Sequence, residues 1–481
     1  MAANDKLHIV MFPWLAFGHI LPYLKLAKLI AKKGHKISFI STPRNIDRLP
    51  KIPPNLAPHI DLVKFPLPSI PNLPENAEAT IDVPFNKVKY LKIAYDQLQQ
   101  PLTQFLVSNS PNWILFDIIA YWVGPIASKL NVRSSFFSIF SASIMGYFGP
   151  PSVLMHSDED RRKPEDYSIK PKWVRFETTV AMSLHQMQST FVNFTEDDTE
   201  NVPDQYRFAA SIRDCEMVAV RSSSVFEPEW LELLDEIYQK PVVQVGLLPT
   251  DTTDTDTGGK SNDSWRDIKD WLDKQEKVSV IYVAFGAETK PNQDELTELA
   301  LGLELSGLPF IWALRKQRGS ADPEPTELPE GFEERTRGHG LFYTSWVPQT
   351  KILSHDSVGG LLIHSGWSSV IEAVQFGRAL VLLPLLADQE LIAKLVEEKK
   401  MGYLIPRNER DGWFSRDSVA ESVRLVMVDE EGKIYRDNVK EMKGVFGDMD
   451  KQDEYVDNLL SYLESHKILT KMSRLERPHR D

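Results

Sequence analysis

The stretch Trp346–Gln389 decides how the rest of the chain is interpreted. It reads WVPQTKILSHDSVGGLLIHSGWSSVIEAVQFGRALVLLPLLADQ. The apolar run Gly360–Ile363 predicts a strand, and a helical pattern follows the small residues after it. Gly377 is typical of a helix end, and the apolar run Ala379–Leu383 predicts the next strand. This order indicates a parallel α/β sheet, in which strand-to-helix turns present backbone N–H groups to a phosphate.

The polar side chains near these turns are the kinds that a nucleotide-sugar site needs. His364 follows the first predicted strand, where its imidazole can reach a diphosphate. Glu372 lies one turn into the predicted helix, in place to accept hydrogen bonds from ribose hydroxyls. Asp388 and Gln389 follow the second strand and can bind further hydroxyls, and the aromatic Trp346 can stack on a base. Together they predict a nucleotide-sugar site.

The stretch resembles the signature box of plant secondary-product UDP-glycosyltransferases. The N-terminal pattern FPxxxxGHxxP and the predicted strand SVIYVAFG also match the family, so the resemblance covers nearly the whole chain. The anchors of the box that fall at the family's spacing are Trp346, Pro348, Gln349, His364, Gly366, Trp367, Ser369, Glu372, Pro384, Asp388 and Gln389. The resemblance implies the GT-B fold, in which two Rossmann-like doubly wound α/β domains face a cleft. It also implies an acceptor site in the N-terminal domain and a sugar-donor site in the C-terminal one.

Strand and helix patterns alternate in two series, which independently predicts two doubly wound parallel sheets. The first series of predicted strands is Leu7–Met11, Lys36–Ser41, Asp61–Phe65, Asn112–Asp117, Ser134–Ile139, Met217–Arg221 and Val242–Val245. The second is Val278–Phe285, Pro309–Leu314 and Gly340–Trp346, followed by the two strands of the signature box. Helices are predicted over Ile20–Lys33, Tyr121–Leu130, Gln293–Leu305 and Gln452–Lys467. The chain length of 481 residues also fits more than one domain.

The domain boundary is predicted at a segment without apolar residues. Residues 250–264 read TDTTDTDTGGKSNDS and are interpreted as a linker. We therefore expect an acceptor-binding domain over residues 1–249 and a UDP-sugar-binding domain over residues 265–455. A C-terminal helix and tail would occupy residues 456–481, and the resemblance implies that this helix returns to the N-terminal domain.

Composition excludes several classes of partner. A net charge of −13 argues against non-specific binding to nucleic acid or to anionic membranes. The single cysteine, Cys215, excludes an intrachain disulfide. The N-terminus shows no signal-peptide pattern, and the apolar run Ala379–Ala387 is far too short to cross a bilayer. We expect a cytoplasmic monomer without an integral membrane segment.

No metal and no cofactor are expected, and the UDP-sugar is a donor substrate. Acidic pairs that can signal a metal site occur at Asp158–Asp160, Asp254–Asp256 and Asp448–Asp450. The chain has 68 acidic residues, so such pairs arise easily by chance and are interpreted as solvated charge.

The reaction implied by the resemblance is displacement of UDP from the anomeric carbon of a sugar by an acceptor hydroxyl. A hydroxyl is a poor nucleophile, so a base must remove its proton. His19 is the candidate base, since it ends the first strand-to-helix turn and matches the histidine of FPxxxxGHxxP. Asp117 ends a predicted strand and is the candidate orienting acid. The alternatives are that His19 caps or packs against the helix that begins there, and that Asp117 caps a helix. A single displacement inverts the anomeric carbon.

The remaining donor-site residues come from the resemblance. The whole set is Gly286, Ala287, Trp346, Val347, Gln349, His364, Gly366, Trp367, Ser368, Ser369, Glu372, Asp388 and Gln389. Gly286 permits close backbone approach to a phosphate. Ala287 stands where the family usually has a serine or threonine, so only its N–H can serve. Trp367 is predicted to pack near the sugar, or else in plain core. Phe17, Trp122, Phe140 and Tyr147 are candidates either for an apolar acceptor pocket or for the core.

The departures from the family pattern narrow the expected reaction. The common sequence HCGWNS is HSGWSS here, so Ser368 replaces an asparagine, and Ile392 stands where an asparagine often follows. This variant resembles the clade that extends sugar chains, which includes rhamnosyltransferases of triterpenoid saponins and glucosyltransferases of diterpenoid and flavonoid glycosides. We therefore expect an inverting transfer of glucose or rhamnose to a hydroxyl, on a sugar of an existing glycoside. The alternatives are transfer directly to an aglycone, a nucleotide-sugar epimerase of the same fold, and a binder without activity.

Overall fold

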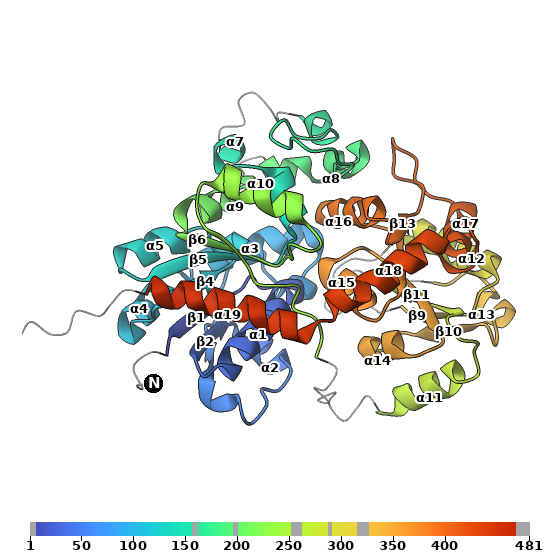
Figure 1. Ribbon diagram of the computed structural model, residues 1–481, viewed down its shortest axis with the longest axis horizontal. Coiled ribbons are helices and arrows are strands. Elements are labelled where there is room, and N and C mark those ends of the chain that lie inside the picture. Colours follow the sequence, from blue (N-terminus) through green and yellow to red (C-terminus); the bar gives the residue numbers. More distant parts are fainter. Residues whose placement is uncertain are drawn as a thin grey trace, which may run out of the picture.

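Two α/β domains lie side by side, each built on one parallel sheet covered by helices (Figure 1). The computed structural model describes residues 6–155, 161, 163–195, 201–251, 262–286, 291–314 and 327–467. The fold class predicted from the alternating patterns is confirmed by this arrangement.

The N-terminal sheet has seven parallel strands in the order β3-β2-β1-β4-β5-β6-β7. They are β1 (His8–Phe12), β2 (Lys36–Ser41), β3 (Ile60–Lys64), β4 (Trp113–Phe116), β5 (Arg133–Ser138), β6 (Met217–Val220) and β7 (Val242–Gln244). The central strands are buried on both faces, which explains their nearly continuous apolar sequences. β1 pairs with β4 so that Phe12 lies beside Phe116. The residues that follow these two strands therefore leave the sheet at neighbouring points of one edge.

The C-terminal sheet has six parallel strands in the order β10-β9-β8-β11-β12-β13. They are β8 (Val280–Ala284), β9 (Phe310–Ala313), β10 (Gly340–Tyr343), β11 (Val358–Ile363), β12 (Ala379–Leu382) and β13 (Gly402–Leu404). All predicted strands of both series are present, with ends shifted by a few residues. β13 was not predicted, because three residues at a sheet edge leave no apolar pattern to recognise.

Helices connect the strands in both domains. In the first half they are α1 (Phe17–Lys32), α2 (Pro43–Arg48), α3 (Val88–Asp96), α4 (Gln99–Asn109), α5 (Val123–Lys129), α6 (Ala142–Phe148), α7 (Pro151–Met155), α8 (Leu184–Thr195), α9 (Asp204–Asp214) and α10 (Pro228–Tyr238). In the second half they are α11 (Asn262–Leu272), α12 (Gln293–Ser306), α13 (Phe332–Arg335), α14 (Gln349–Ser354), α15 (Trp367–Gln375), α16 (Ala387–Glu398), α17 (Arg416–Met427), α18 (Lys433–Phe446) and α19 (Met449–Ser465). Short 3₁₀ helices are η1 (Ala57–His59), η2 (Thr80–Asp82), η3 (Phe85–Lys87), η4 (Ile118–Ala120) and η5 (Pro164–Tyr167).

The chain crosses between the domains twice, first after β7 and again at the elbow between α18 and α19. The predicted linker over residues 250–264 extends too far toward the C-terminus, because α11 already begins at Asn262. Residues 252–261 of the predicted linker lie outside the described residues. The predicted boundary at residue 456 is also wrong, because it falls inside α19. That helix begins at Met449, where the side chain of Asp448 accepts a hydrogen bond from the backbone N–H of Lys451.

Helix α19 packs on the N-terminal domain, across α1 in Figure 1. Its apolar face is buried in the same core as residues of α1, β1 and β2, and consists of Val456, Leu459, Leu460 and Leu463. The indole of Trp113 on β4 donates a hydrogen bond to the Leu463 carbonyl at 3.0 Å. The C-terminal helix, which follows α18 of the C-terminal domain, therefore packs on the N-terminal domain and connects the two.

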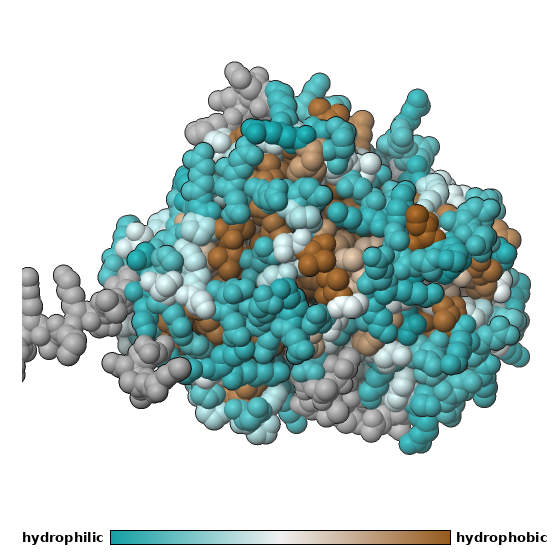
Figure 2. Space-filling view, in the orientation of Figure 1, coloured by the Kyte–Doolittle hydropathy of each residue, from teal (hydrophilic) through white to brown (hydrophobic). Residues whose placement is uncertain are grey.

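An aromatic cluster lies where the domains meet. The ring of Phe226, just after β6, stacks on Trp367 of α15 with centroids 5.8 Å apart and meets the edge of Phe446 of α18 at 5.0 Å. Figure 2 shows apolar atoms gathered in the middle of this face of the molecule, between the two domains. Because all three rings are buried, the two domains share a continuous apolar core at this junction.

Candidate active site

His19 and Asp117 form a hydrogen-bonded pair at the edge of the N-terminal sheet. The Nδ1 atom of His19 lies 2.8 Å from Oδ2 of Asp117. The carboxylate is fully buried, and it also accepts from the backbone N–H groups of Trp14 at 3.0 Å and Ile118 at 2.8 Å. Three donors around one carboxylate fix its orientation. The charged acceptor in turn keeps a proton on Nδ1 of His19, which makes Nε2 the basic nitrogen.

The strand register explains why residues so far apart in sequence meet. Asp117 directly follows β4, whose neighbour β1 leads through a short turn into α1. Helix α1 begins at Phe17, three residues earlier than predicted, so His19 lies within its first turn rather than before it. His19 keeps 14% of its side chain exposed, whereas Asp117 keeps 1%. The exposed fraction leaves the ring accessible to a substrate.

The four aromatic candidates for the acceptor pocket separate into two groups. Trp122 is buried against Phe12 and donates its indole N–H to Asp96. Tyr147 is buried and donates its hydroxyl to the carbonyl of Tyr167. Both therefore belong to the core.

Phe140 and Phe17 keep part of their surface exposed near the histidine. Phe140, which follows β5, meets the imidazole of His19 edge-on with centroids 5.7 Å apart. Phe17 opens α1 and is half-buried. These two rings remain candidates for an apolar wall beside His19.

In the C-terminal domain, His364 lies between two glycines that have no room for a side chain. A Cβ atom on Gly366 would lie 2.9 Å from Nε2 of His364, and one on Gly286 would lie 3.1 Å from its Cε1. Gly286 also has a φ of +73°, which favours glycine. Burial lowers the pKa of His364 to about 4, so the ring is neutral at pH 7. His364 can therefore donate a hydrogen bond to an anion, but it does not bring a positive charge of its own.

The Nδ1 atom of His364 is buried and makes no hydrogen bond of good geometry among the described residues, although the backbone of Ala284 lies near enough to the ring to oppose the fall in its pKa. A buried polar atom without a partner is costly unless a ligand or water satisfies it. His364 thus belongs to a place where a polar ligand fits. Ala287, the neighbour of Gly286, lies outside the described residues, so the predicted role of its N–H is not resolved.

The first turn of α15 faces the N-terminal domain. Trp367 is buried and donates its indole N–H to the carbonyl of Arg221 at 3.0 Å, so its core interpretation is the one that the contacts favour. The hydroxyl of Ser368 accepts a hydrogen bond from the guanidinium of Arg221 at 2.7 Å. Ser369 is half-buried, and its backbone N–H begins the helix by bonding to Gly366. The helix start is the type of place where an anion binds.

Glu372 is tied to three other groups. Its Oε2 accepts from the amide of Gln349 at 2.8 Å, and its Oε1 accepts from the hydroxyl of Thr250 at 3.0 Å. The ammonium of Lys25 lies 4.0 Å from Oε1. Lys25 stands on α1, six residues after His19, so about 9 Å of helix separates the two. This contact joins the helix of the candidate base to the helix of the candidate donor site.

The remaining donor-site candidates differ in exposure. Trp346 precedes α14 and keeps 47% of its surface exposed, as a stacking platform requires, whereas Val347 beside it is fully buried. Gln389 is 6% exposed, and its Oε1 caps α16 by accepting from the backbone N–H groups of Leu385 and Leu386. Only the amide nitrogen of Gln389 is then available to donate a hydrogen bond to a sugar hydroxyl. Asp388 stands beside it in the first turn and is half-buried.

The residues that the structure describes form neither a metal-binding cluster nor a membrane-spanning helix. No three His, Cys, Asp or Glu side chains within the described ranges come together in a way that could hold a metal ion. No helix in that part of the chain is both long and apolar enough to cross a membrane. Two of the acidic pairs, Asp158–Asp160 and Asp254–Asp256, lie outside the described residues. The third contains Asp448, which caps α19.

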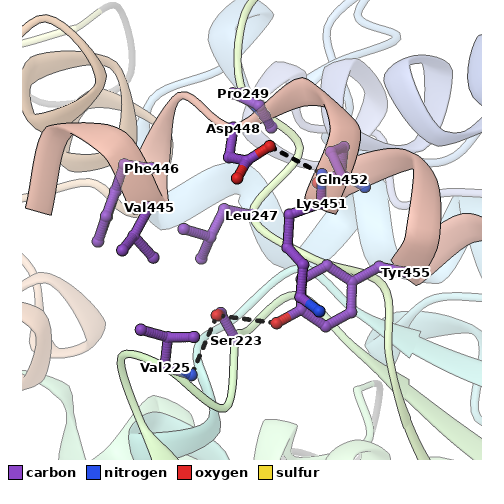
Figure 3. Close-up of a pocket in the computed structure, with 10 residues that line it drawn as sticks. All are labelled: Ser223, Val225, Leu247, Pro249, Val445, Phe446, Asp448, Lys451, Gln452 and Tyr455. Carbon is purple, nitrogen blue, oxygen red and sulfur yellow. Dashed lines mark hydrogen bonds between the residues drawn. The ribbon is translucent and has the colours of Figure 1, made fainter.

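A cavity of about 170 Å³ lies at the hinge between the domains (Figure 3). Its walls come from the loop after β6, from the first domain crossing and from the elbow between α18 and α19. The lining residues are Ser223, Val225, Leu247, Pro249, Val445, Phe446, Asp448, Lys451, Gln452 and Tyr455. None of the predicted site residues lines it, so it is distinct from the pair of His19 and Asp117.

Three residues that connect the two halves of the site were not predicted. Arg221 follows β6, Thr250 follows the first crossing, and Lys25 stands in the middle of α1. The position of Arg221 after an apolar strand was a usable signal, since functional groups gather at the carboxyl ends of parallel strands. Nothing local distinguishes Lys25 or Thr250 from other surface residues, because their partners come from a distant helix.

Comparison with known proteins agrees with this arrangement. The family model described as UDP-glucoronosyl and UDP-glucosyl transferase matches residues 240–454. The chain is 53% identical to UDP-glycosyltransferase 91A1 of Arabidopsis thaliana over 467 residues, which covers 96% of this chain and 98% of the relative. It is 42% identical to soyasaponin III rhamnosyltransferase of Glycine max over 473 residues, covering 97% of each chain.

A solved structure has the same fold. The crystal structure of Glycyrrhiza uralensis UGT73P12 complexed with glycyrrhetinic acid 3-O-monoglucuronide superposes with a TM-score of 0.74. The match covers 96% of both chains at 22% sequence identity, and at that identity it supports the GT-B fold alone. The level of identity to the plant relatives, over almost their whole length, shows the family itself. The chain belongs to the plant UDP-glycosyltransferases of family 1.

Proposed function

We propose that this UDP-glycosyltransferase transfers glucose or rhamnose from a UDP-sugar to a hydroxyl on a sugar of an existing plant glycoside, with inversion at the anomeric carbon. The observation that supports it most directly is the 2.8 Å hydrogen bond between Nδ1 of His19 and Oδ2 of Asp117. It gives the site a base with a defined tautomer and a buried carboxylate behind it.

The base acts through Nε2 of His19. As the acceptor oxygen bonds to the anomeric carbon, its proton passes to Nε2, and the ring becomes an imidazolium. The ionised Asp117 stabilises that imidazolium through the Nδ1–H hydrogen bond, as the acid does in other orienting pairs. The bond from the anomeric carbon to the UDP oxygen breaks in the same step. One displacement without a covalent intermediate inverts the carbon.

The departing diphosphate is stabilised from the C-terminal domain. The first turn of α15 presents backbone N–H groups and the hydroxyls of Ser368 and Ser369. His364 adds a neutral N–H donor, because its pKa of about 4 keeps it uncharged at pH 7. The exposed Trp346 is the stacking surface for uracil, and Glu372 accepts from the ribose hydroxyls with lone pairs that Gln349 and Thr250 leave available. We expect no metal requirement.

The choice of acceptor rests on likeness to named relatives. A relative that is 42% identical over 97% of its chain is named soyasaponin III rhamnosyltransferase. The HSGWSS form of the signature box points the same way, toward a chain-extending enzyme. A saponin glycoside is therefore the first acceptor to try, and UDP-rhamnose and UDP-glucose are the first donors.

Product formation detected by mass spectrometry tests this proposal. UDP-glucose and UDP-rhamnose are each offered with saponin, flavonoid and diterpenoid aglycones and with their monoglucosides, in the presence of a chelator. The expected result is transfer to monoglucosides only, with a mass increase that identifies the sugar. Transfer to aglycones alone would overturn the chain-extending assignment. Loss of UDP-sugar without any acceptor product would favour an epimerase, and UDP binding without turnover would favour a binder.

A further inference from the structure

A buried arginine links the N-terminal domain to the start of the helix where the donor diphosphate is proposed to bind. Arg221 directly follows β6 and is 1% exposed. Its Nε donates to the carbonyl of Leu247 at 2.9 Å, and one terminal nitrogen donates to the hydroxyl of Ser368 at 2.7 Å. Its own carbonyl accepts from the indole of Trp367 at 3.0 Å. Arg221 therefore contacts the first two residues of α15 and the first domain crossing at once.

The charge of Arg221 is not explained by an ion pair. Among the described residues its second terminal nitrogen has no hydrogen-bond partner, and no carboxylate lies within ion-pair distance. Burial lowers the pKa of Arg221 to about 9, and the charge of nearby Glu372 opposes that shift. Glu372 is itself bonded to Gln349 and Thr250. A buried cation without a carboxylate partner lowers stability, so its presence points to a role with an anionic ligand.

The contact with Ser368 has a defined chemical effect. A serine hydroxyl has one proton to donate and two lone pairs that accept. When a guanidinium N–H occupies one lone pair, the hydroxyl proton is directed away from the arginine, and the cation makes the hydroxyl a stronger donor. Ser368 is the second residue of α15, where backbone N–H groups already favour an anion.

We propose that Arg221 is a positioning residue of the donor site, which holds the Ser368 hydroxyl as a hydrogen-bond donor to the diphosphate of the UDP-sugar. This inference rests on the proposed function, since it takes the start of α15 as the diphosphate site. The proposal explains how the short side chain of Ser368 can act as a donor to the diphosphate, because the guanidinium of Arg221 from the N-terminal domain orients its hydroxyl. It also assigns the N-terminal domain a part in donor binding.

The hinge geometry gives the pair a rigid support. Leu247, which accepts from Arg221 through its carbonyl, lines the hinge cavity with its side chain (Figure 3). The adjoining Leu248 is held by Gln452 of α19, whose Oε1 accepts from its N–H at 2.8 Å. Arg221 is thus anchored to the crossing on one side and reaches α15 on the other. A change in the angle between the domains would move Ser368 relative to its donor.

The test compares the binding of UDP and uridine, which differ only in the diphosphate. The variants are Arg221→Gln, Arg221→Lys, Ser368→Ala and the double variant Arg221→Gln/Ser368→Ala, measured by calorimetry on the full chain. Arg221→Gln and Ser368→Ala are each expected to lower the affinity for UDP about tenfold, since each removes one partner of a charge-assisted hydrogen bond. Uridine affinity should stay unchanged. The double variant should be no weaker than either single variant, and Arg221→Lys should recover part of the loss.

Arg378→Gln is the matched control. Arg378 is a partly buried arginine of the C-terminal domain that also donates to backbone carbonyls, those of Leu353 and His355. Its replacement should leave both affinities unchanged. If Arg221→Gln does not fold, Ser368→Ala still tests the pair, because it removes a single oxygen from a half-buried side chain.

Three outcomes would overturn the proposal. Equal weakening of UDP and uridine would mean that Arg221 only supports the fold. Unchanged UDP affinity in Ser368→Ala would mean that its hydroxyl does not reach the diphosphate. If the loss of UDP affinity in the double variant equals the product of the two single fold-losses, the two residues act independently. These outcomes are distinct from failure of the proposed function, because wild-type protein that transfers no sugar can still show the difference between UDP and uridine.

Discussion

His19 and Asp117 are joined by a 2.8 Å hydrogen bond although 98 residues separate them in the sequence. The pairing of β1 with β4 brings them together, since each follows one of two adjacent parallel strands. The carboxylate is buried and held by two backbone N–H groups, so it cannot turn away from the imidazole. The bond therefore fixes both the orientation and the tautomer of the candidate base.

Replacing Asp117 with asparagine should lower kcat by about 10²- to 10⁴-fold, as loss of an orienting acid does. An amide directs an N–H toward the ring, which favours the wrong tautomer of His19. UDP affinity should stay unchanged, because the hydrogen-bond partners of the Asp117 carboxylate are His19 and the backbone of Trp14 and Ile118, none of which belongs to the candidate donor site. Steady-state kinetics and calorimetry check the two parts. His59→Ala, a change of a partly exposed histidine on η1, is the control, and an equal fall in UDP affinity would argue against an orienting role.

The pKa of His364 makes stability depend on pH in a defined direction. Its value is about 4 in the native state and 6.5 in the unfolded chain, so the unfolded state binds more protons between these values. Stability should therefore fall as pH decreases from about 6.5 to about 4, with this group contributing about 3 kcal/mol. His364→Gln should remove that contribution. Urea unfolding at several pH values measures it.

The control for His364 is His59→Gln, and the quantity compared is the difference in unfolding free energy from wild type. As pH falls from 7 to 4, wild type should lose more unfolding free energy than His364→Gln, so the difference between them should change in the direction of a relatively more stable variant. A difference that stays constant from pH 7 to pH 4 would show that His364 is not perturbed.

Much of the fold follows from local pattern, and the reasons for the exceptions are physical. Runs such as Val280–Ala284 are apolar because both faces of a parallel strand are buried, so their positions could be predicted. The edge strand Gly402–Leu404 is stabilised by pairing with β12, which has no local signature. The start of α19 at Met449 depends on the cap by Asp448, and the sequence pattern of the pair Asp448–Asp450 does not distinguish a helix cap from solvated charge.

The candidate site also contains residues that could be predicted from the sequence and contacts that could not. His19, Asp117 and His364 stand at strand ends or helix starts, and this placement could be predicted from the sequence. The partners of Glu372 could not, because Gln349 and Thr250 reach it from other elements. Ser368 stands where the common family sequence has an asparagine. The structure gives it a new partner, Arg221, from the other domain.

Gly366→Ala should weaken UDP binding by about tenfold or more without unfolding the protein. The added methyl group would lie 2.9 Å from Nε2 of His364, so the ring must move from its place beside Gly286. The backbone φ of −60° at Gly366 suits any residue, so no backbone strain is added. Gly444→Ala on α18 is the control, because nothing lies within 4 Å of its added Cβ. UDP affinity equal to that of wild type would show that the position of His364 does not matter for the donor.

Gly246→Ala tests the clasp between the first crossing and α19. An added Cβ would lie 2.4 Å from Oε1 of Gln452 and 2.8 Å from the ring of Tyr455, and the φ of +75° disfavours alanine. Gln452 would have to release its hydrogen bonds to the backbone of Val245 and Leu248. Backbone strain and the lost contacts together should lower the free energy of unfolding by about 2–4 kcal/mol.

Gly307→Ala separates the two causes in that experiment. Gly307 has a similar φ of +69°, but nothing lies within 4 Å of its added Cβ, so only backbone strain of about 1 kcal/mol is expected. The excess loss in Gly246→Ala then measures the contact with α19. Equal losses in the two variants would show that α19 moves aside without cost. A larger loss at Gly246 would show that the hinge depends on close packing of the crossing against α19, the same crossing that anchors Arg221.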